Sequence, residues 1–222
     1  MGKRSLLIFI SVLSLSPAGW GFNADRARWE KLPVHITEAE VTSLLILPDQ
    51  NPTILIGGPK ALHRSAPMGK ESRAVLQIPG TGSKVNFLYR SEPSSRIFAA
   101  TDAGLFLSSN NGETWKRIFY SADPTIRRCL SVMMDGDWLY LGTEEGLFYR
   151  RFQDTLWQQE KRFLDREIIP SLAKDSQYLY VTTDRKVYRL NKERAQIKQI
   201  FSLPNRENET SPDQNSMENV PL

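Results

Sequence analysis

A strand–turn–strand pattern recurs four times along this chain of 222 residues. The copies are Ile54–His63, Ile97–Phe106, Leu139–Phe148 and Leu179–Tyr188. In each copy a short apolar run leads into a turn, and a second apolar run follows the turn. The equivalent anchor positions are Leu62, Leu105, Leu147 and Val187. Successive anchors lie 43, 42 and 40 residues apart, which indicates that one structural unit is copied along the polypeptide.

Further apolar runs flank each copy and complete the unit. The preceding runs are Val41–Leu47, Val85–Tyr89, Leu130–Met134 and Ile168–Ala173. The following runs are Arg73–Ile78, Thr114–Phe119, Leu156–Glu160 and Gln196–Phe201. Four strands in about 40 residues are the size of one β-propeller blade. We therefore predict an all-β propeller of about four recognisable blades, as a small, partial or oligomer-completed ring, with helix allowed only at 25–30 and 158–166.

The first 21 residues have the pattern of a signal peptide. Lys3 and Arg4 precede the apolar run Ser5–Ser16, and small residues follow at Ala18 and Gly19. The run is shorter than the roughly 20 residues that span a bilayer, so we prefer cleavage to an uncleaved anchor. We predict a signal peptide at 1–21, a repeat domain at 22–203 and a disordered tail at 204–222. The protein is then exported, to a periplasm or outside the cell, with no stable membrane span after cleavage.

The segment Ser108–Trp115 reads Ser-Ser-Asn-Asn-Gly-Glu-Thr-Trp. It resembles the Asp-box, or BNR, motif of sialidase-like, sortilin-like and photosystem II assembly factor-like propellers. The resemblance implies a structural hairpin in which Ser108 and Asn110 bind backbone N–H groups, Gly112 has a positive φ and Trp115 is buried beside Thr114. Trp29 and Trp157 occupy the repeat-equivalent tryptophan position. A calcium site in this loop is disfavoured, because Glu113 is its one carboxylate and calcium takes six to eight oxygen ligands.

The sequence lacks the parts of a recognisable catalytic site. A sialidase would need an Arg-Ile-Pro signature, but Phe98 stands where the proline belongs in Arg96-Ile97-Phe98. His35 and His63 are 28 residues apart without a second ligand at a metal-binding spacing, and Cys129 is the only cysteine. We predict no catalytic residues, no metal and no cofactor, and hence a protein that is not an enzyme.

The remaining question is the partner. The formal net charge of +4 includes Lys3 and Arg4 of the leader, and is too small to indicate nucleic acid. Aromatic and arginine side chains predict a binding surface, and the candidates are Trp138, Tyr149, Phe152, Arg150 and Arg151. We expect a non-catalytic scaffold that binds another protein, with assembly into an oligomer as one way to complete the ring. The alternative is a glycan-binding propeller or a divergent glycoside hydrolase.

An outer strand around Trp29 has no blade of its own. It resembles the run around Trp115, and in many propellers a terminal strand of this kind completes the last blade. Three outcomes stay open, in order of preference. The strand substitutes for the weak final strand of the fourth unit, it pairs with another subunit, or the chain is part of a larger ring.

Overall fold

The computed structural model describes residues 9–10, 30–31, 36, 38–48, 52–65, 71–80, 83–191 and 196–204. Nearly all regular structure in these residues is β-strand, arranged in four sheets of four antiparallel strands. In each of the four sheets the strands follow one another in chain order. The prediction of an all-β fold with four blades is therefore confirmed.

The four sheets are the blades, and each takes its strands from one copy of the repeat. Blade 1 is β3 (Ser43–Leu47), β4 (Thr53–Gly57), β5 (Ala61–Ser65) and β6 (Ser72–Gln77). Blade 2 is β7 (Val85–Arg90), β8 (Ile97–Thr101), β9 (Gly104–Ser108) and β10 (Lys116–Phe119). Blade 3 is β11 (Cys129–Asp135), β12 (Trp138–Thr143), β13 (Gly146–Arg151) and β14 (Gln158–Gln159). Blade 4 is β15 (Ser171–Lys174), β16 (Tyr178–Thr182), β17 (Lys186–Asn191) and β18 (Ile197–Ser202).

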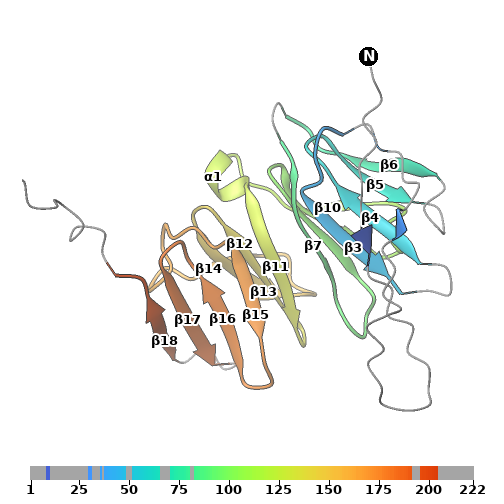
Figure 1. Cartoon of the computed structure of the whole chain (residues 1–222). Helices are drawn as coiled ribbons and strands as arrows, with labels where there is room; N and C mark the ends of the chain where they lie inside the picture. Colours follow the sequence, from blue (N-terminus) through green and yellow to red (C-terminus); the bar gives the residue numbers. More distant parts are fainter. Residues whose placement is uncertain are drawn as a thin grey trace, which may run out of the picture.

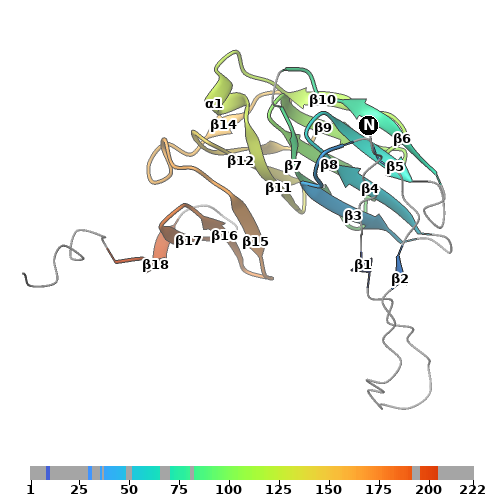
Figure 2. The same cartoon turned by 45° about the horizontal axis from the view of Figure 1, so that its top comes forward.

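The blades stand side by side in an open arc. The first strands of neighbouring blades contact one another, β3 with β7, β7 with β11, and β11 with β15. Blade 1 forms one end of the arc and blade 4 the other (Figures 1 and 2). Among the described residues, each end blade therefore has one face that no other blade covers.

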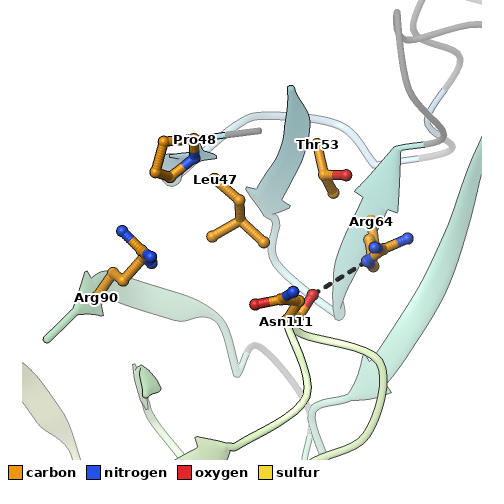
Figure 3. A pocket seen from close by; sticks show the side chains of 6 residues that line it. All are labelled: Leu47, Pro48, Thr53, Arg64, Arg90 and Asn111. Carbon is orange, nitrogen blue, oxygen red and sulfur yellow. Dashed lines mark hydrogen bonds between the residues drawn. The ribbon is translucent and has the colours of Figure 1, made fainter. Parts of the chain in front are cut away.

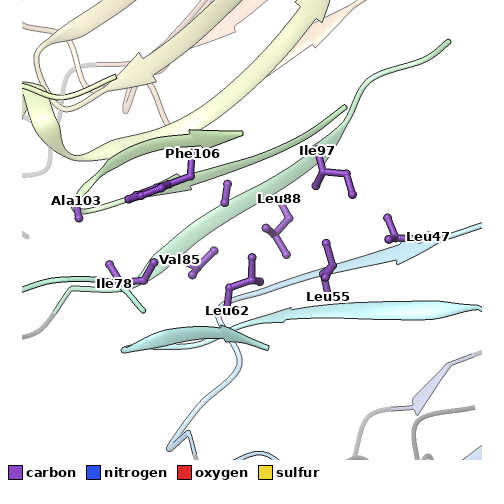
Figure 4. Close-up of a cluster of buried hydrophobic side chains, with 10 residues drawn as sticks. Leu47, Leu55, Leu62, Ile78, Val85, Leu88, Ile97, Ala103 and Phe106 are labelled. Atoms are coloured by element: carbon purple, nitrogen blue, oxygen red, sulfur yellow. The ribbon is translucent and has the colours of Figure 1, made fainter. Parts of the chain in front are cut away.

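Hydrophobic clusters between the blades hold the arc together. The cluster between blades 1 and 2 joins Leu55 and Leu62 to Val85, Leu88 and Ile97 (Figure 4). Two more clusters lie between blades 2 and 3 and between blades 3 and 4. Strand β8 is buried along its whole length because blades 1 and 3 cover its two sides. Strand β4 is buried because blade 2 covers one side, and Ile36 and Val41 cover the other.

The two repeat-equivalent tryptophans in the described residues have related surroundings. Trp115 packs on the cluster between its own blade and blade 1. Trp157 packs on the cluster between its own blade and blade 2, with its ring 5.2 Å from that of Phe119. Each ring thus helps to attach its blade to the preceding blade.

A short helix lies outside the two stretches, 25–30 and 158–166, in which helix was allowed. The single helix in the described residues, α1 (Pro124–Arg127), lies between blades 2 and 3. Asp123 caps it, accepting a hydrogen bond from Thr125 N at 2.9 Å, and proline occupies the first turn. The allowance for helix at 158–166 was wrong, because Gln158–Gln159 forms β14 and turns follow.

Several predictions concern the ends of the chain. Residues 1–8, 11–21 and 205–222 of the predicted signal peptide and tail lie outside the described residues, as does Trp29. Strand β1 (Phe9–Ile10) pairs with β2 (Glu30–Lys31) in a separate sheet. The predicted outer strand of the fourth unit at Gln196–Phe201 is present as β18, so the preferred outcome, in which the strand around Trp29 takes its place, was wrong.

Candidate functional site

We call the face of a blade that meets the preceding blade its upstream face, and the opposite one its downstream face. The upstream face of blade 1 is the first end face, made of Leu44, Ile46, Ile54 and Ile56. These residues share a face because Leu44 pairs with Ile56, and Ile46 with Ile54, across β3 and β4. Their sequence neighbours Leu45, Leu47 and Leu55 point the other way, into the cluster with blade 2.

The first end face exposes a position that the other blades bury. In blades 2, 3 and 4 the residues Leu88, Val132 and Leu172 have the cross-strand pairing that Leu44 has in blade 1. They are 5%, 0% and 8% exposed, whereas Leu44 is 40% exposed. Ile46, beside it, is 41% exposed. Leu44 is therefore exposed where the repeat otherwise places a neighbouring blade, and Ile46 extends the exposed apolar surface.

A short segment before β3 covers the rest of this face. Ile36 and Val41 pack on Ile54 and Ile56, which are almost fully buried. Glu38 lies 3.4 Å from Nε2 of His63, and both side chains are 8% exposed. The open part of the first end face is therefore the inner strand β3, and the covered part is β4.

The second end face is the downstream face of blade 4, made of Tyr178, Tyr180, Val187 and Arg189. The guanidinium of Arg189 lies 4.2 Å from the ring centre of Tyr178, and the rings of Tyr178 and Tyr180 are 6.4 Å apart. Tyr180 donates a hydrogen bond to Asp175 at 2.7 Å, and the pKa of its hydroxyl is raised chiefly because this hydrogen bond stabilises the protonated form. Tyrosine and arginine are the residue types that most often anchor protein interfaces.

The predicted surface residues are divided between the two faces of blade 3. Trp138 and Tyr149 lie 6.2 Å apart and pack on the cluster with blade 4, with the Arg151 guanidinium 5.3 Å above the Trp138 ring. Phe152 and Arg150 instead face blade 2. The five residues thus do not form one patch, and their role in binding stays a prediction.

Arg150 is nearly buried, which the sequence did not indicate. It is 8% exposed, and its guanidinium lies 4.9 Å above the ring of Trp157. Nη1 donates to the carbonyl of Phe152 at 3.2 Å. The pKa of Arg150 is lowered, chiefly because burial disfavours the charged form. The side chain packs within the junction of blades 2 and 3.

The residues that resemble an Asp-box, Ser108–Trp115, form the hairpin between β9 and β10. Ser108 Oγ accepts from the N–H of Gly112 at 2.9 Å, and Asn110 Oδ1 accepts from the N–H of Thr114 at 3.0 Å. Gly112 has φ of 79°, and a Cβ there would lie 2.9 Å from Leu55 of blade 1. Trp115 Nε1 donates to the carbonyl of Gly112 at 3.1 Å.

The same hairpin joins blade 2 to blade 1 through charged groups. Glu113 forms ion pairs with Arg64, at 3.0 Å, and with Arg73. Arg64 Nε also donates to the carbonyl of Asn111 at 3.1 Å, beside a shallow hollow (Figure 3). The hollow is lined by Leu47, Pro48, Thr53, Arg64, Arg90 and Asn111. Both arginines are already paired, since Arg90 binds Glu92 and Ser95.

The hairpin gives a prediction on stability. Asn110→Ala removes the acceptor for Thr114 N and the donor to Thr114 Oγ1, so we expect it to lower the free energy of unfolding by about 1–2 kcal/mol. Asn110→Asp keeps the acceptor, and we expect a loss below about 1 kcal/mol. Urea denaturation of both variants measures the difference, and equal losses would contradict the assigned role of Oδ1.

Cys129 gives a second prediction. The thiol is fully buried between blades 2 and 3, and burial raises its pKa well above the ordinary value. We expect labelling by iodoacetamide to be on the order of 100-fold slower in the folded chain than in urea. Ser109→Cys, at an exposed position of the Asp-box hairpin, is the control and should react at once. Rapid labelling of folded Cys129 would contradict the packing of this junction.

The described part of the chain lacks both a metal-binding cluster and a helix that could cross a membrane. It contains no group of three histidine, cysteine, aspartate or glutamate side chains arranged to hold a metal ion. His63 is paired with Glu38, and His35 lies outside the described residues. Within the same residues, no helix has the length and apolar character needed to cross a bilayer.

No protein-family model and no curated protein matches the chain. Solved structures do match it. An ancestral GH74 enzyme is 20% identical, with a TM-score of 0.62, over 78% of this chain and 27% of its own. A GH74 enzyme from Niastella koreensis is 18% identical, with a TM-score of 0.58, over 81% and 33%. The extracellular domain of a putative hybrid two component system from B. thetaiotaomicron is 17% identical, with a TM-score of 0.58, over 74% and 25%.

These similarities define the class of fold. At 20% identity or less they show architecture alone, and together with the four sheets they make this chain a partial β-propeller. The chain spans about a quarter to a third of the length of these matched structures.

Proposed function

We propose that the chain is an exported, non-catalytic propeller scaffold of the Asp-box type that binds a protein through its end faces. The observation that carries the proposal is the 40% exposure of Leu44 at a position where blades 2 to 4 bury the equivalent residue. In the other blades the side chain at this position packs against a neighbouring sheet. A second polypeptide that covers Leu44 would remove its apolar surface from water, which stabilises the complex.

The second end face supports the same function. Tyr178, Tyr180 and Arg189 supply large, partly buried anchors with polar ends, which suit contacts that must form and break in water. The side chains on the two end faces differ, apolar on blade 1 and aromatic with a cation on blade 4. The two ends can therefore distinguish the orientation of a partner.

Site-specific photocrosslinking in the exporting compartment tests the proposal. A benzoylphenylalanine at position 44 or 180 should form discrete adducts with protein. The same group at position 156 or 120, where Leu156 is 80% and Tyr120 is 55% exposed away from the end faces, should form far fewer. Equal adducts at all four positions, or none at 44 and 180, would contradict the proposal.

A glycan-binding or glycoside-hydrolysing propeller is the second candidate. It is favoured by the partly exposed tyrosine pair Tyr178 and Tyr180, because flat aromatic rings also stack on sugars. Incubation of the purified chain with a panel of polysaccharides and glycosides separates the two. Turnover, or glycan binding that Tyr178→Ala abolishes, would select this candidate over the protein-binding scaffold.

A further inference from the structure

We infer that the partner of the end faces is a second copy of this chain, joined head to tail so that blade 4 of each copy packs on blade 1 of the other. This inference rests on the proposed function and names the partner. Both faces belong to one polypeptide, and each carries the residues that the repeat uses in its internal blade junctions.

The first step is that the second end face repeats a face that already binds a blade. Tyr178, Tyr180 and Arg189 lie 40 residues after Trp138, Tyr140 and Tyr149. Those earlier residues belong to the cluster in which blade 3 packs on blade 4. Blade 4 therefore offers a following blade an aromatic surface of the same kind.

The second step is that the first end face repeats the surface that receives such residues. In blade 4 this surface comprises Leu172, Leu179 and Val181, which pack against Tyr140. Their equivalents in blade 1, by register, are Leu44, Ile54 and Ile56. Ile36 and Val41 already cover Ile54 and Ile56, so the junction of blades 3 and 4 is a template for the contact at β3 alone. There it predicts that Tyr180 of one copy meets Leu44 of the other.

The third step is charge, which favours contact between unlike faces. Arg189 and Lys198 are neighbours across β17 and β18, so the second end face carries two cations beside the carboxylate of Asp175. The carboxylate of Glu38 lies on the covered part of the first end face, where it is paired with His63. Two second end faces would bring the cations of one copy against those of the other, whereas the head-to-tail arrangement places them opposite the uncharged residues Leu44 and Ile46.

The fourth step is closure. Two copies related by a two-fold axis make both contacts at once, and together they have eight blades. Eight is within the range of about four to eight blades that closed propellers use. A heterologous contact that closes after two copies gives a defined dimer and not a filament. The segment at Ile36 and Val41 leaves β3, with Leu44 and Ile46, open to the partner.

Sedimentation equilibrium of the purified mature chain tests the inference. We expect a mass twice that of one chain. Leu44→Glu and Tyr180→Glu should each raise the dissociation constant on the order of 100-fold, because each places a charge in an apolar contact. Leu156→Glu and Tyr120→Glu, on exposed residues away from both end faces, are the matched controls and should leave the mass doubled. Circular dichroism reports whether each variant is folded.

The outcomes separate this inference from the function on which it rests. A dimer that survives Tyr180→Glu but not Leu44→Glu would be a symmetric contact of two first end faces, and would overturn the head-to-tail arrangement. A single-chain mass with protein adducts at positions 44 and 180 would overturn the second copy as partner while the scaffold function stands. A single-chain mass without such adducts would overturn both.

A disulfide cross-link gives a readout that does not depend on destabilising the contact. Oxidation of the variant with both Leu44→Cys and Tyr180→Cys should give covalent dimers, while either single variant should give none. Cys129 is buried and does not interfere. Equal cross-linking of a single variant would contradict the predicted pairing of residues 44 and 180.

Discussion

Phe98→Ala should lower the free energy of unfolding by about 3–5 kcal/mol. The Phe98 ring is fully buried between blades 2 and 3, with Tyr89 at 6.3 Å and Phe152 at 6.4 Å between ring centres. Its removal leaves a cavity between two sheets whose backbones are fixed by their own hydrogen bonds, so the site cannot collapse fully. Urea denaturation followed by tryptophan fluorescence measures the loss.

Phe163→Ala is the matched control for Phe98. Phe163 is 49% exposed, and we expect its removal to cost less than about 1 kcal/mol. If the two variants lost similar amounts, the cluster between blades 2 and 3 would not be the core that the fold requires.

Gly142→Val is expected to separate blade 4 from blade 3. A Cβ at Gly142 would lie 2.4 Å from the carbonyl oxygen of Ile169, and 2.4 Å from Ser131 Oγ. Relief of these clashes moves the backbone that enters blade 4. It also breaks the bonds from Ser131 Oγ to Ile169 O, at 3.0 Å, and from Ile169 N to Thr143 O, at 2.9 Å. Overpacking and two lost hydrogen bonds together cost about 3–5 kcal/mol.

Hydrogen exchange locates the effect of Gly142→Val. Amides of β15 to β18 should lose protection before those of blades 1 and 2. Gly136→Asn is the control, since a Cβ at Gly136 meets nothing within 4 Å and asparagine tolerates its φ of 56°. Uniform loss of protection over the whole chain would contradict a junction that can open by itself.

The blades could be predicted from the sequence because their signal is both local and periodic. Each strand is a short apolar run bounded by turn residues, and the anchors from Leu62 to Val187 recur at the period of one blade. The boundaries were less accurate, since the predicted strand Leu156–Glu160 is ordered only as Gln158–Gln159. Helix α1 was missed because one turn has no hydrophobic period, although Asp123-Pro124 is a start signal for a helix.

The candidate site could not be predicted in the same way. Leu44 and Leu88 have similar sequence surroundings, and only the position of a blade in the arc decides which of them is covered. Arg150 and Arg151 are adjacent in sequence, yet strand alternation buries Arg150 over Trp157 and leaves Arg151 exposed. A sequence pattern of arginine and aromatic residues therefore indicates a binding surface only when it is known which faces of the blade are covered by neighbouring blades.

Hydroxyl-radical footprinting of the chain, diluted until its mass is that of a single copy, tests the open arc most directly. Labelling of each leucine or valine reports its contact with water. We expect strong labelling of Leu44 and protection of its buried equivalents Leu88, Val132 and Leu172. Protection of Leu44 equal to that of Leu88 would mean that the chain covers its own first end face, and would contradict the account.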